Sequence, residues 1–230
     1  MKGAVDMNKL EWACYACFTP RYYRGISIFF AVLCSAAGVL ASVGFGVWGA
    51  MIMPYLFFVV MGMTDFIVFA GSTERNPGDM NFIRSSGYGV SYMRNVYKTD
   101  IIFKTVLNVF GTLGSIVYCF ILGPVQGLYA LMCCELLLVI LMLTLVTTRR
   151  KAMTLNAQTP YIYAGSIALL LSDGAMVFLI LKFGNDRFSW VLPLILDIVF
   201  GGLTVWACLR LYRESNRGFE SGYRPNENVV

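Results

Sequence analysis

Six long apolar stretches dominate the chain and constrain its fold more than any other feature. A helix that crosses a bilayer needs about 20 consecutive, largely apolar residues. Glycines between positions 44 and 49 separate the first stretch from the second, and Gly123-Pro124 separates the third from the fourth. We therefore expect an all-α, polytopic membrane protein with six transmembrane helices, at Ile26–Phe45, Ala50–Gly71, Ile101–Leu122, Gly127–Thr148, Tyr161–Phe183 and Phe188–Leu211.

Composition excludes several classes of protein. The chain is 58% apolar and only 13% charged, so a soluble domain would lack the polar residues to cover its surface. It has no histidine, the commonest general base and metal ligand, so neither a metal site nor catalytic residues are expected. It also lacks the Gly-x-x-x-x-Gly-Lys-Ser/Thr loop that binds ATP.

The basic residues predict the orientation in the membrane. Of the 18 Lys and Arg residues, all except Lys182 and Arg187 fall in or directly beside four regions. These regions are the two terminal segments, the connection between spans two and three, and the connection between spans four and five. Basic residues near membrane spans are concentrated on the cytoplasmic side. We therefore expect a multi-pass plasma-membrane protein, of bacterial type, with both termini in the cytoplasm.

The chain divides into three expected parts. Residues 1–25 form a cytoplasmic interfacial segment, in which an amphipathic helix lies in the inner membrane interface and Pro20 marks an elbow. Residues 26–211 form the six-helix transmembrane domain, and residues 212–230 form a flexible cytoplasmic tail. The second part includes the long cytoplasmic connection at 72–100, which joins its second and third spans.

This connection contains a candidate docking element. Pro77-Gly78-Asp79 predicts a turn, and Asp79 is suited to cap a short helix that runs from Met80 to about Ser86. The segment is either a solvated loop or a surface that receives force from a soluble partner. For the second interpretation the candidate docking residues are Asp79, Asn81, Phe82, Arg84, Ser85 and Tyr88.

The run Met80-Asn-Phe-Ile-Arg-Ser-Ser-Gly-Tyr-Gly89, between spans two and three of six, resembles the coupling segment of ATP-binding-cassette transporter permeases of the type-two exporter class. That family usually has Pro where Gly87 stands. The architectural resemblance covers nearly the whole chain and includes the elbow helix. It implies a permease subunit without chemistry of its own, paired with a second permease subunit, identical or different. It also implies a cytoplasmic ATP-binding subunit that holds ATP and Mg²⁺, so no cofactor is expected on this chain.

Three acidic residues lie inside predicted spans: Glu135, Asp173 and Asp197. Each lies roughly 12–15 Å below the outer surface, at 1.5 Å of helix rise per residue. A carboxylate that faces lipid is costly, so all three are expected to face the bundle or a water-filled pathway. Two interpretations stay open: neutral carboxyls that hydrogen-bond between helices, or groups on a translocation pathway that share protons or attract a cationic substrate.

Other charged and thiol residues have simpler interpretations. Asp65 and Lys104 lie near the inner ends of spans two and three, and we expect a structural ion pair between them. Arg149-Arg150-Lys151 is interpreted as a topology anchor that attracts anionic lipid. Cys14 and Cys17 are three residues apart without a second pair or a histidine, which favours interfacial packing over a metal site.

The sequence thus predicts the permease subunit of an ATP-driven exporter that moves a hydrophobic or amphipathic substrate outward: a peptide, a drug-like compound or a lipid-like compound. Its expected partners are the ATPase, a second permease and membrane lipid, with no nucleic acid. A proton-coupled secondary transporter that uses the intramembrane acids is the main alternative. A lipid-acting membrane enzyme and an accessory membrane protein are further alternatives.

Overall fold

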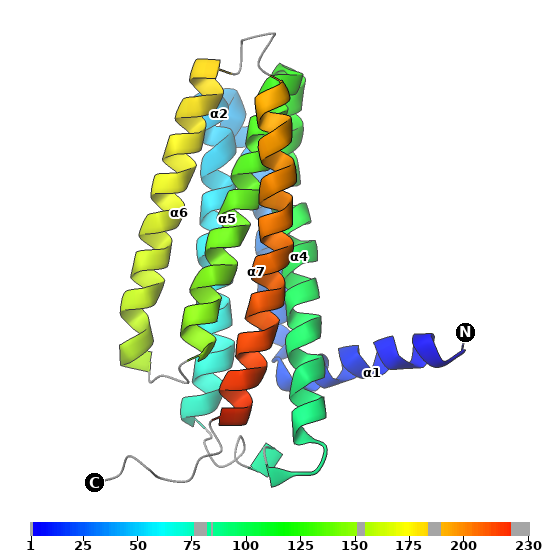
Figure 1. Ribbon diagram of the computed structural model, residues 1–230. Helices are drawn as coiled ribbons and strands as arrows, with labels where there is room; N and C mark the ends of the chain where they lie inside the picture. Colours follow the sequence, from blue (N-terminus) through cyan, green and yellow to red (C-terminus); the bar gives the residue numbers. More distant parts are fainter. Residues whose placement is uncertain (1, 76–81, 84, 151–154, 184–189, 222–230) are drawn as a thin grey trace.

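The computed structural model describes residues 2–75, 82–83, 85–150, 155–183 and 190–221, and every regular element in this part of the chain is an α-helix (Figure 1). Five of these helices are long and apolar enough to cross a membrane. The elements are α1 (Lys2–Phe18), α2 (Arg21–Arg75), α4 (Gly89–Leu122), α5 (Pro124–Arg150), α6 (Leu155–Phe183) and α7 (Val191–Ser221).

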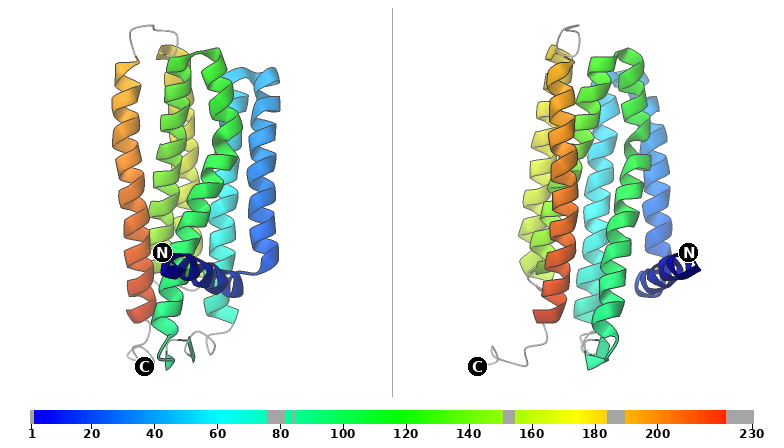
Figure 2. Two further views of the ribbon diagram at one scale, coloured as in Figure 1. Left: turned by 90° about the vertical axis from the view of Figure 1, so that its right-hand side faces the viewer. Right: turned by 45° about the vertical axis from the view of Figure 1, so that its right-hand side comes forward.

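Helix α2 is a hairpin of two membrane-length arms. Its 55 residues would extend about 80 Å as one straight helix, far beyond the roughly 30 Å of a bilayer core. Gly46 breaks it with φ 60° and ψ −139°, a left-handed conformation that only glycine adopts readily. The arms then approach so closely that a Cβ on Gly49 would lie 2.2 Å from the carbonyl oxygen of Ala41. The two arms run side by side in Figure 2, so the longest apolar helix is folded back on itself.

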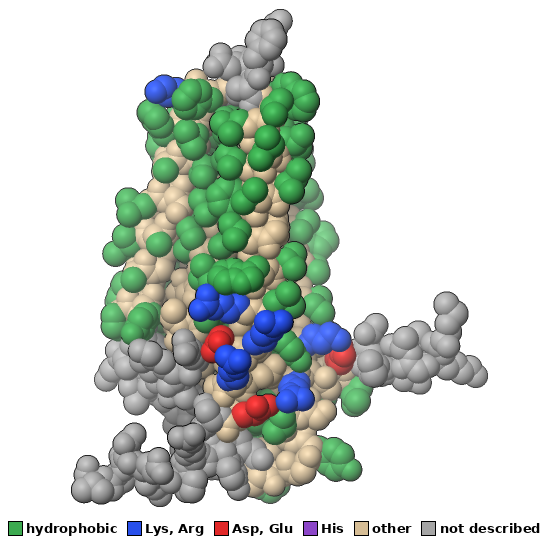
Figure 3. Space-filling model, in the orientation of Figure 1, with side chains coloured by type: hydrophobic (Ala, Val, Ile, Leu, Met, Phe, Trp, Pro, Cys, Tyr) green, Lys and Arg blue, Asp and Glu red, His purple; other side chains and the backbone are tan. Residues whose placement is uncertain are grey.

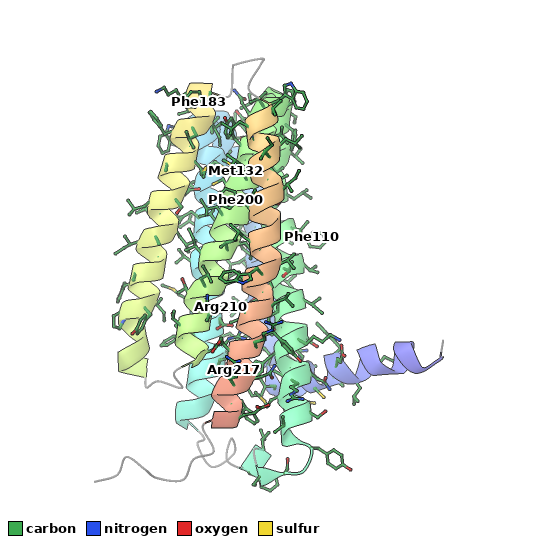
Figure 4. All side chains as sticks on the ribbon, viewed as in Figure 1. Phe110, Met132, Phe183, Phe200, Arg210 and Arg217 are labelled. Carbon is green, nitrogen blue, oxygen red and sulfur yellow. The ribbon has the colours of Figure 1, made fainter. Side chains whose placement is uncertain are left out.

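Helix α5 forms the centre of the bundle. Of its most apolar stretch, 61% is buried, against 17% for α7. Its apolar residues surround the whole helix, as expected of a helix without a polar face. Met132, Leu137, Leu141 and Leu145 are almost completely buried against the neighbouring helices, and Figure 4 shows Met132 on the interior part of α5.

The outside of the bundle is apolar along most of its length, and charge gathers at one end. In Figure 3 hydrophobic side chains cover the upper part of the visible face, whereas most basic and acidic side chains lie in the lower part. Figure 4 places Arg210 and Arg217 on this lower part of α7. We call this end of the bundle the basic end. Lys182 lies in the last turn of α6, at the opposite end.

Helix α1 lies crosswise at the basic end, outside the bundle (Figures 1 and 2). It ends at Phe18, and α2 begins at Arg21 after Pro20. Proline lacks the backbone N–H needed to continue a helix, so the chain turns at this point. The break between the two helices thus falls where Pro20 predicted it.

Helices α4 and α7 extend furthest beyond the spans that the sequence predicts. The third span, expected from Ile101, belongs to a helix that begins at Gly89, since Met93, Val96 and Tyr97 bury one face of the added turns. The segment expected as a flexible tail from residue 212 is helical as far as Ser221. Leu211, Ser215 and Phe219 recur every fourth residue and are at most 4% exposed, which explains the extension.

Candidate functional site

Four buried charges meet near the basic end, and we call them the four-charge network: Asp65 of α2, Asp100 and Lys104 of α4, and Arg149 of α5. Lys104 Nζ lies 2.6 Å from Asp65 Oδ1, and Arg149 Nη2 lies 2.6 Å from Asp100 Oδ2. Lys104 also contacts Asp100, and Arg149 also contacts Asp65. Each cation therefore bridges both carboxylates, and three helices are joined.

The network is electrically neutral and shielded from solvent. Asp65 and Asp100 are each 2% exposed, Lys104 is 5% exposed, and the Arg149 side chain is 4% exposed. The Arg149 guanidinium also lies over the Phe69 ring, 3.9 Å from its centroid. A buried charge that loses its partner destabilises a protein by roughly 3–5 kcal/mol. These four residues therefore hold α2, α4 and α5 in one arrangement.

Helix α1 joins this network through Tyr15. The Tyr15 hydroxyl donates a hydrogen bond to Asp100 Oδ1 at 3.4 Å, and the side chain is only 3% exposed. Burial and the nearby charge of Asp100 raise the pKa of Tyr15 far above its ordinary value, which keeps the phenol protonated as a donor.

Two further contacts attach α1 to the beginning of α4. Lys98 Nζ lies 2.8 Å from Glu11 Oε1, and the Tyr92 hydroxyl donates to the carbonyl oxygen of Cys14 at 3.2 Å. With the Tyr15 hydrogen bond, α1 thus contacts α4 at Tyr92, Lys98 and Asp100. The crosswise helix is therefore fixed to the same helix that begins directly after the expected docking segment.

The described part of the docking segment carries exposed aromatic residues. Phe82 is 74% exposed and Tyr88 is 86% exposed, and Ser85 is also exposed. Asp79, Asn81 and Arg84, the other expected docking residues, lie outside the described residues. Both aromatic side chains therefore lie on the surface and not in the helical core.

A tight turn connects this segment to α4. The Gly89 N–H donates to the carbonyl oxygen of Ser86 at 3.0 Å. A Cβ on Gly89 would lie 1.5 Å from the carbonyl oxygen of Ile83, so only glycine fits there. Ile83 packs inward against a cluster formed by Tyr15, Met93, Val96, Tyr97 and Phe219. A displacement of the 82–88 turn would thus move α4, α1 and the end of α7 together.

Of the three intramembrane acids, Glu135 and Asp197 lie close enough for their charges to interact, whereas Asp173 has other neighbours. Glu135 faces α7, where a Cβ on Gly201 would lie 3.6 Å from Glu135 Oε1. Asp197 lies one turn before Gly201, and neither of its carboxylate oxygens has a hydrogen-bond partner among the described residues. Asp173 lies on α6, accepts a hydrogen bond from Cys133 Sγ at 3.6 Å, and lines a cavity beside α2.

Sequence reasoning identified half of the four-charge network. It expected Asp65 and Lys104 to pair, and the structure brings these two side chains into contact. It missed Asp100, although Asp100 and Lys104 are four residues apart on one helix face, a spacing that places side chains together. It also interpreted Arg149 as a topology anchor, because the residue begins a run of three basic residues that appears solvent-exposed from sequence alone.

Within the described ranges, no three His, Cys, Asp or Glu side chains are grouped so that they could hold a metal ion. Comparison with known proteins found no matching family model, no similar curated protein and no similar solved structure.

Proposed function

We propose that this chain is the membrane-spanning permease subunit of an ATP-driven exporter and that a separate ATPase subunit docks on residues 82–88. One observation carries the proposal: Phe82 and Tyr88 are exposed on a turn that continues directly into α4. Exposed aromatic residues of this kind are typical anchors of protein interfaces. The family resemblance of the 80–89 run supports the same assignment.

The contacts of α4 support a mechanism. ATP-driven closure of the ATPase pushes on the turn, and α4 receives the displacement along its axis. Because the four-charge network and Tyr15 link α4 to α1, α2 and α5, these helices move as one body. A rigid-body movement of this kind would alternate the bundle between inward-open and outward-open states within a permease dimer.

The proposed orientation places the basic end in the cytoplasm, with both termini on that side. The distribution of Lys and Arg supports this orientation. In a chain without its seven cysteines, Tyr88→Cys is predicted to react with a membrane-impermeant maleimide only after the cells are permeabilised. Reaction in intact cells would place the turn away from any source of ATP and remove the proposal.

Coupled ATP hydrolysis tests the docking role. The chain is purified from its native membrane together with the ATPase that binds it, and the complex is reconstituted in nanodiscs. Phe82→Ala and Tyr88→Ala are expected to weaken the stimulation of ATP hydrolysis by the permease, because a buried aromatic anchor contributes about 2 kcal/mol, roughly thirtyfold in affinity. Phe110→Ala is the matched control, since Phe110 is 56% exposed and points away from the bundle on the apolar part of α4 (Figure 4). Unchanged stimulation in both docking variants would argue against docking at this turn.

A proton-coupled secondary transporter is the second candidate, and Asp197 favours it. Both carboxylate oxygens of Asp197 are buried without a partner among the described residues, next to the α7 glycine that faces Glu135. Such an acid is suited to bind and release a proton. This candidate predicts uptake or efflux in vesicles that follows an imposed pH gradient without ATP and is lost in Asp197→Asn.

A further inference from the structure

A cavity of about 480 Å³ opens between the two arms of α2 and α6. This volume is within the range of roughly 300–1,000 Å³ that small-molecule sites occupy. Its walls are mostly apolar and include the aromatic residues Phe45, Trp48 and Tyr55. The cavity lies beside the Gly46 bend of α2, so it is at the end of the bundle opposite the basic end.

Among the described residues that line the cavity, Asp173 is the one that carries a charge. Asp173 is 7% exposed, and its hydrogen-bond partner among the described residues is Cys133 Sγ at 3.6 Å. A thiol is a weak donor and carries no positive charge. No ion pair in the described part of the chain includes Asp173. It lies ten residues before Phe183, the end of α6, which is about 15 Å of helix.

We infer that this cavity binds an amphipathic cation, whose ammonium group pairs with Asp173 and whose apolar body lies against the rings of Phe45, Trp48 and Tyr55. The charge is complementary, because a carboxylate in an apolar medium is stabilised by a cation at contact distance. Trp and Tyr rings attract cations through their faces, so the walls favour the same ligand. This inference rests on the proposed function, since it specifies the exported substrate as a cationic amphiphile.

The other intramembrane acids do not share these features. Glu135 faces α7, and neither Glu135 nor Asp197 lines the cavity. Gly174 does line the cavity, and a Cβ at this position would meet no atom within 4 Å. A larger side chain at residue 174 would therefore fill the cavity without a clash at its first carbon.

The test is equilibrium binding of rhodamine 6G, a fluorescent amphipathic cation, to the purified chain in nanodiscs of neutral phosphatidylcholine. Fluorescence anisotropy gives Kd without any ATPase present. Asp173→Asn and Gly174→Leu should each raise Kd at least tenfold. The matched control Gly202→Leu should leave Kd unchanged, because a Cβ on Gly202 also meets no atom within 4 Å and Gly202 lies on α7, away from the cavity.

Competition identifies the charge requirement. Decyltrimethylammonium should displace the probe, whereas decanol, which has the same chain without the charge, should not. Wild-type Kd in Asp173→Asn, equal displacement by decanol, or no binding by the wild-type chain would each overturn the cation site. Because binding needs no ATP, its failure with docking-dependent ATP hydrolysis intact would remove only the substrate class. Binding without such hydrolysis would instead leave the cavity in place and remove the exporter.

Discussion

Removal of Arg149 is the perturbation that tests the four-charge network most severely. Arg149→Met leaves Asp65 and Asp100 with Lys104 as their one remaining cation in the network, so a neutral buried group acquires a net charge of −1. The variant also loses two ion-pair contacts and the guanidinium that lies 3.9 Å from the centroid of the Phe69 ring. The expected loss is roughly 3–5 kcal/mol of unfolding free energy, the usual cost of breaking a buried ion pair on one side.

Restoring neutrality should recover much of this loss. The double variant Asp65→Asn, Arg149→Met keeps one carboxylate, Asp100, beside one cation, Lys104, which lies within ion-pair distance. Its loss should be smaller than the sum of the two single losses by about 1–3 kcal/mol, as expected of coupled neighbours. Equilibrium unfolding in mixed dodecyl maltoside and SDS micelles, followed by circular dichroism, measures each free energy.

The matched control is Arg210→Met, because Arg210 is exposed and contacts the Trp206 ring on the surface of α7. This variant should lose less than about 1 kcal/mol, the usual value of an exposed charged contact. Two results would contradict the network: an unfolding free energy of Arg149→Met no lower than that of Arg210→Met, or a double variant that loses the full sum of the two single losses. Either result would mean that the network does not hold the helices together and that the proposed transmission through α4 is wrong.

Three further substitutions test the packing by the same unfolding measurement. Tyr15→Phe removes a long hydrogen bond and should lose about 0.5–1.5 kcal/mol while α1 stays in place; a loss no larger than experimental error would mean that the bond does not form. Gly114→Leu should lower the free energy of unfolding by more than 2 kcal/mol, because its Cβ would lie 2.0 Å from a backbone oxygen of α2. Gly202→Leu has open space and should leave the free energy of unfolding nearly unchanged. Equal losses in the two variants would contradict the packing. Gly46→Ala should lose about 1–2 kcal/mol because φ is 60° at that position, and no loss would mean that the hairpin bends elsewhere.

The sequence was informative wherever a property depends on neighbours along the chain. Hydropathy predicted the apolar crossings, because each span requires a run of residues with one character. The glycines at 44–49 predicted a turn, and Gly46 adopts the positive φ that a turn between two arms of α2 requires. Pro20 predicted the elbow, because proline interrupts a helix whatever its surroundings.

Properties that depend on contacts between distant residues were harder to predict. Arg149 joins the network because the rotation of α5 about its axis directs this side chain toward Asp65 and Asp100 and not toward the surface. The helical end of α7 depends on Phe219, which is buried against residues of α4 more than 100 positions earlier. The cavity at Asp173 is formed by two arms of α2 and by α6, so no single stretch of sequence records it.

The most direct test of the central claim is photo-cross-linking in intact cells. A benzoylphenylalanine at residue 88 replaces an exposed Tyr88, and the same group at residue 110 replaces Phe110, which is exposed on the apolar part of α4, as the control. The account predicts that illumination joins the residue 88 variant, and not the residue 110 variant, to a protein that mass spectrometry identifies by its Gly-x-x-x-x-Gly-Lys-Ser/Thr loop as an ATPase. If residue 88 captured no ATPase while the variant was inserted normally in the membrane, the proposed docking of an ATPase on residues 82–88 would be contradicted.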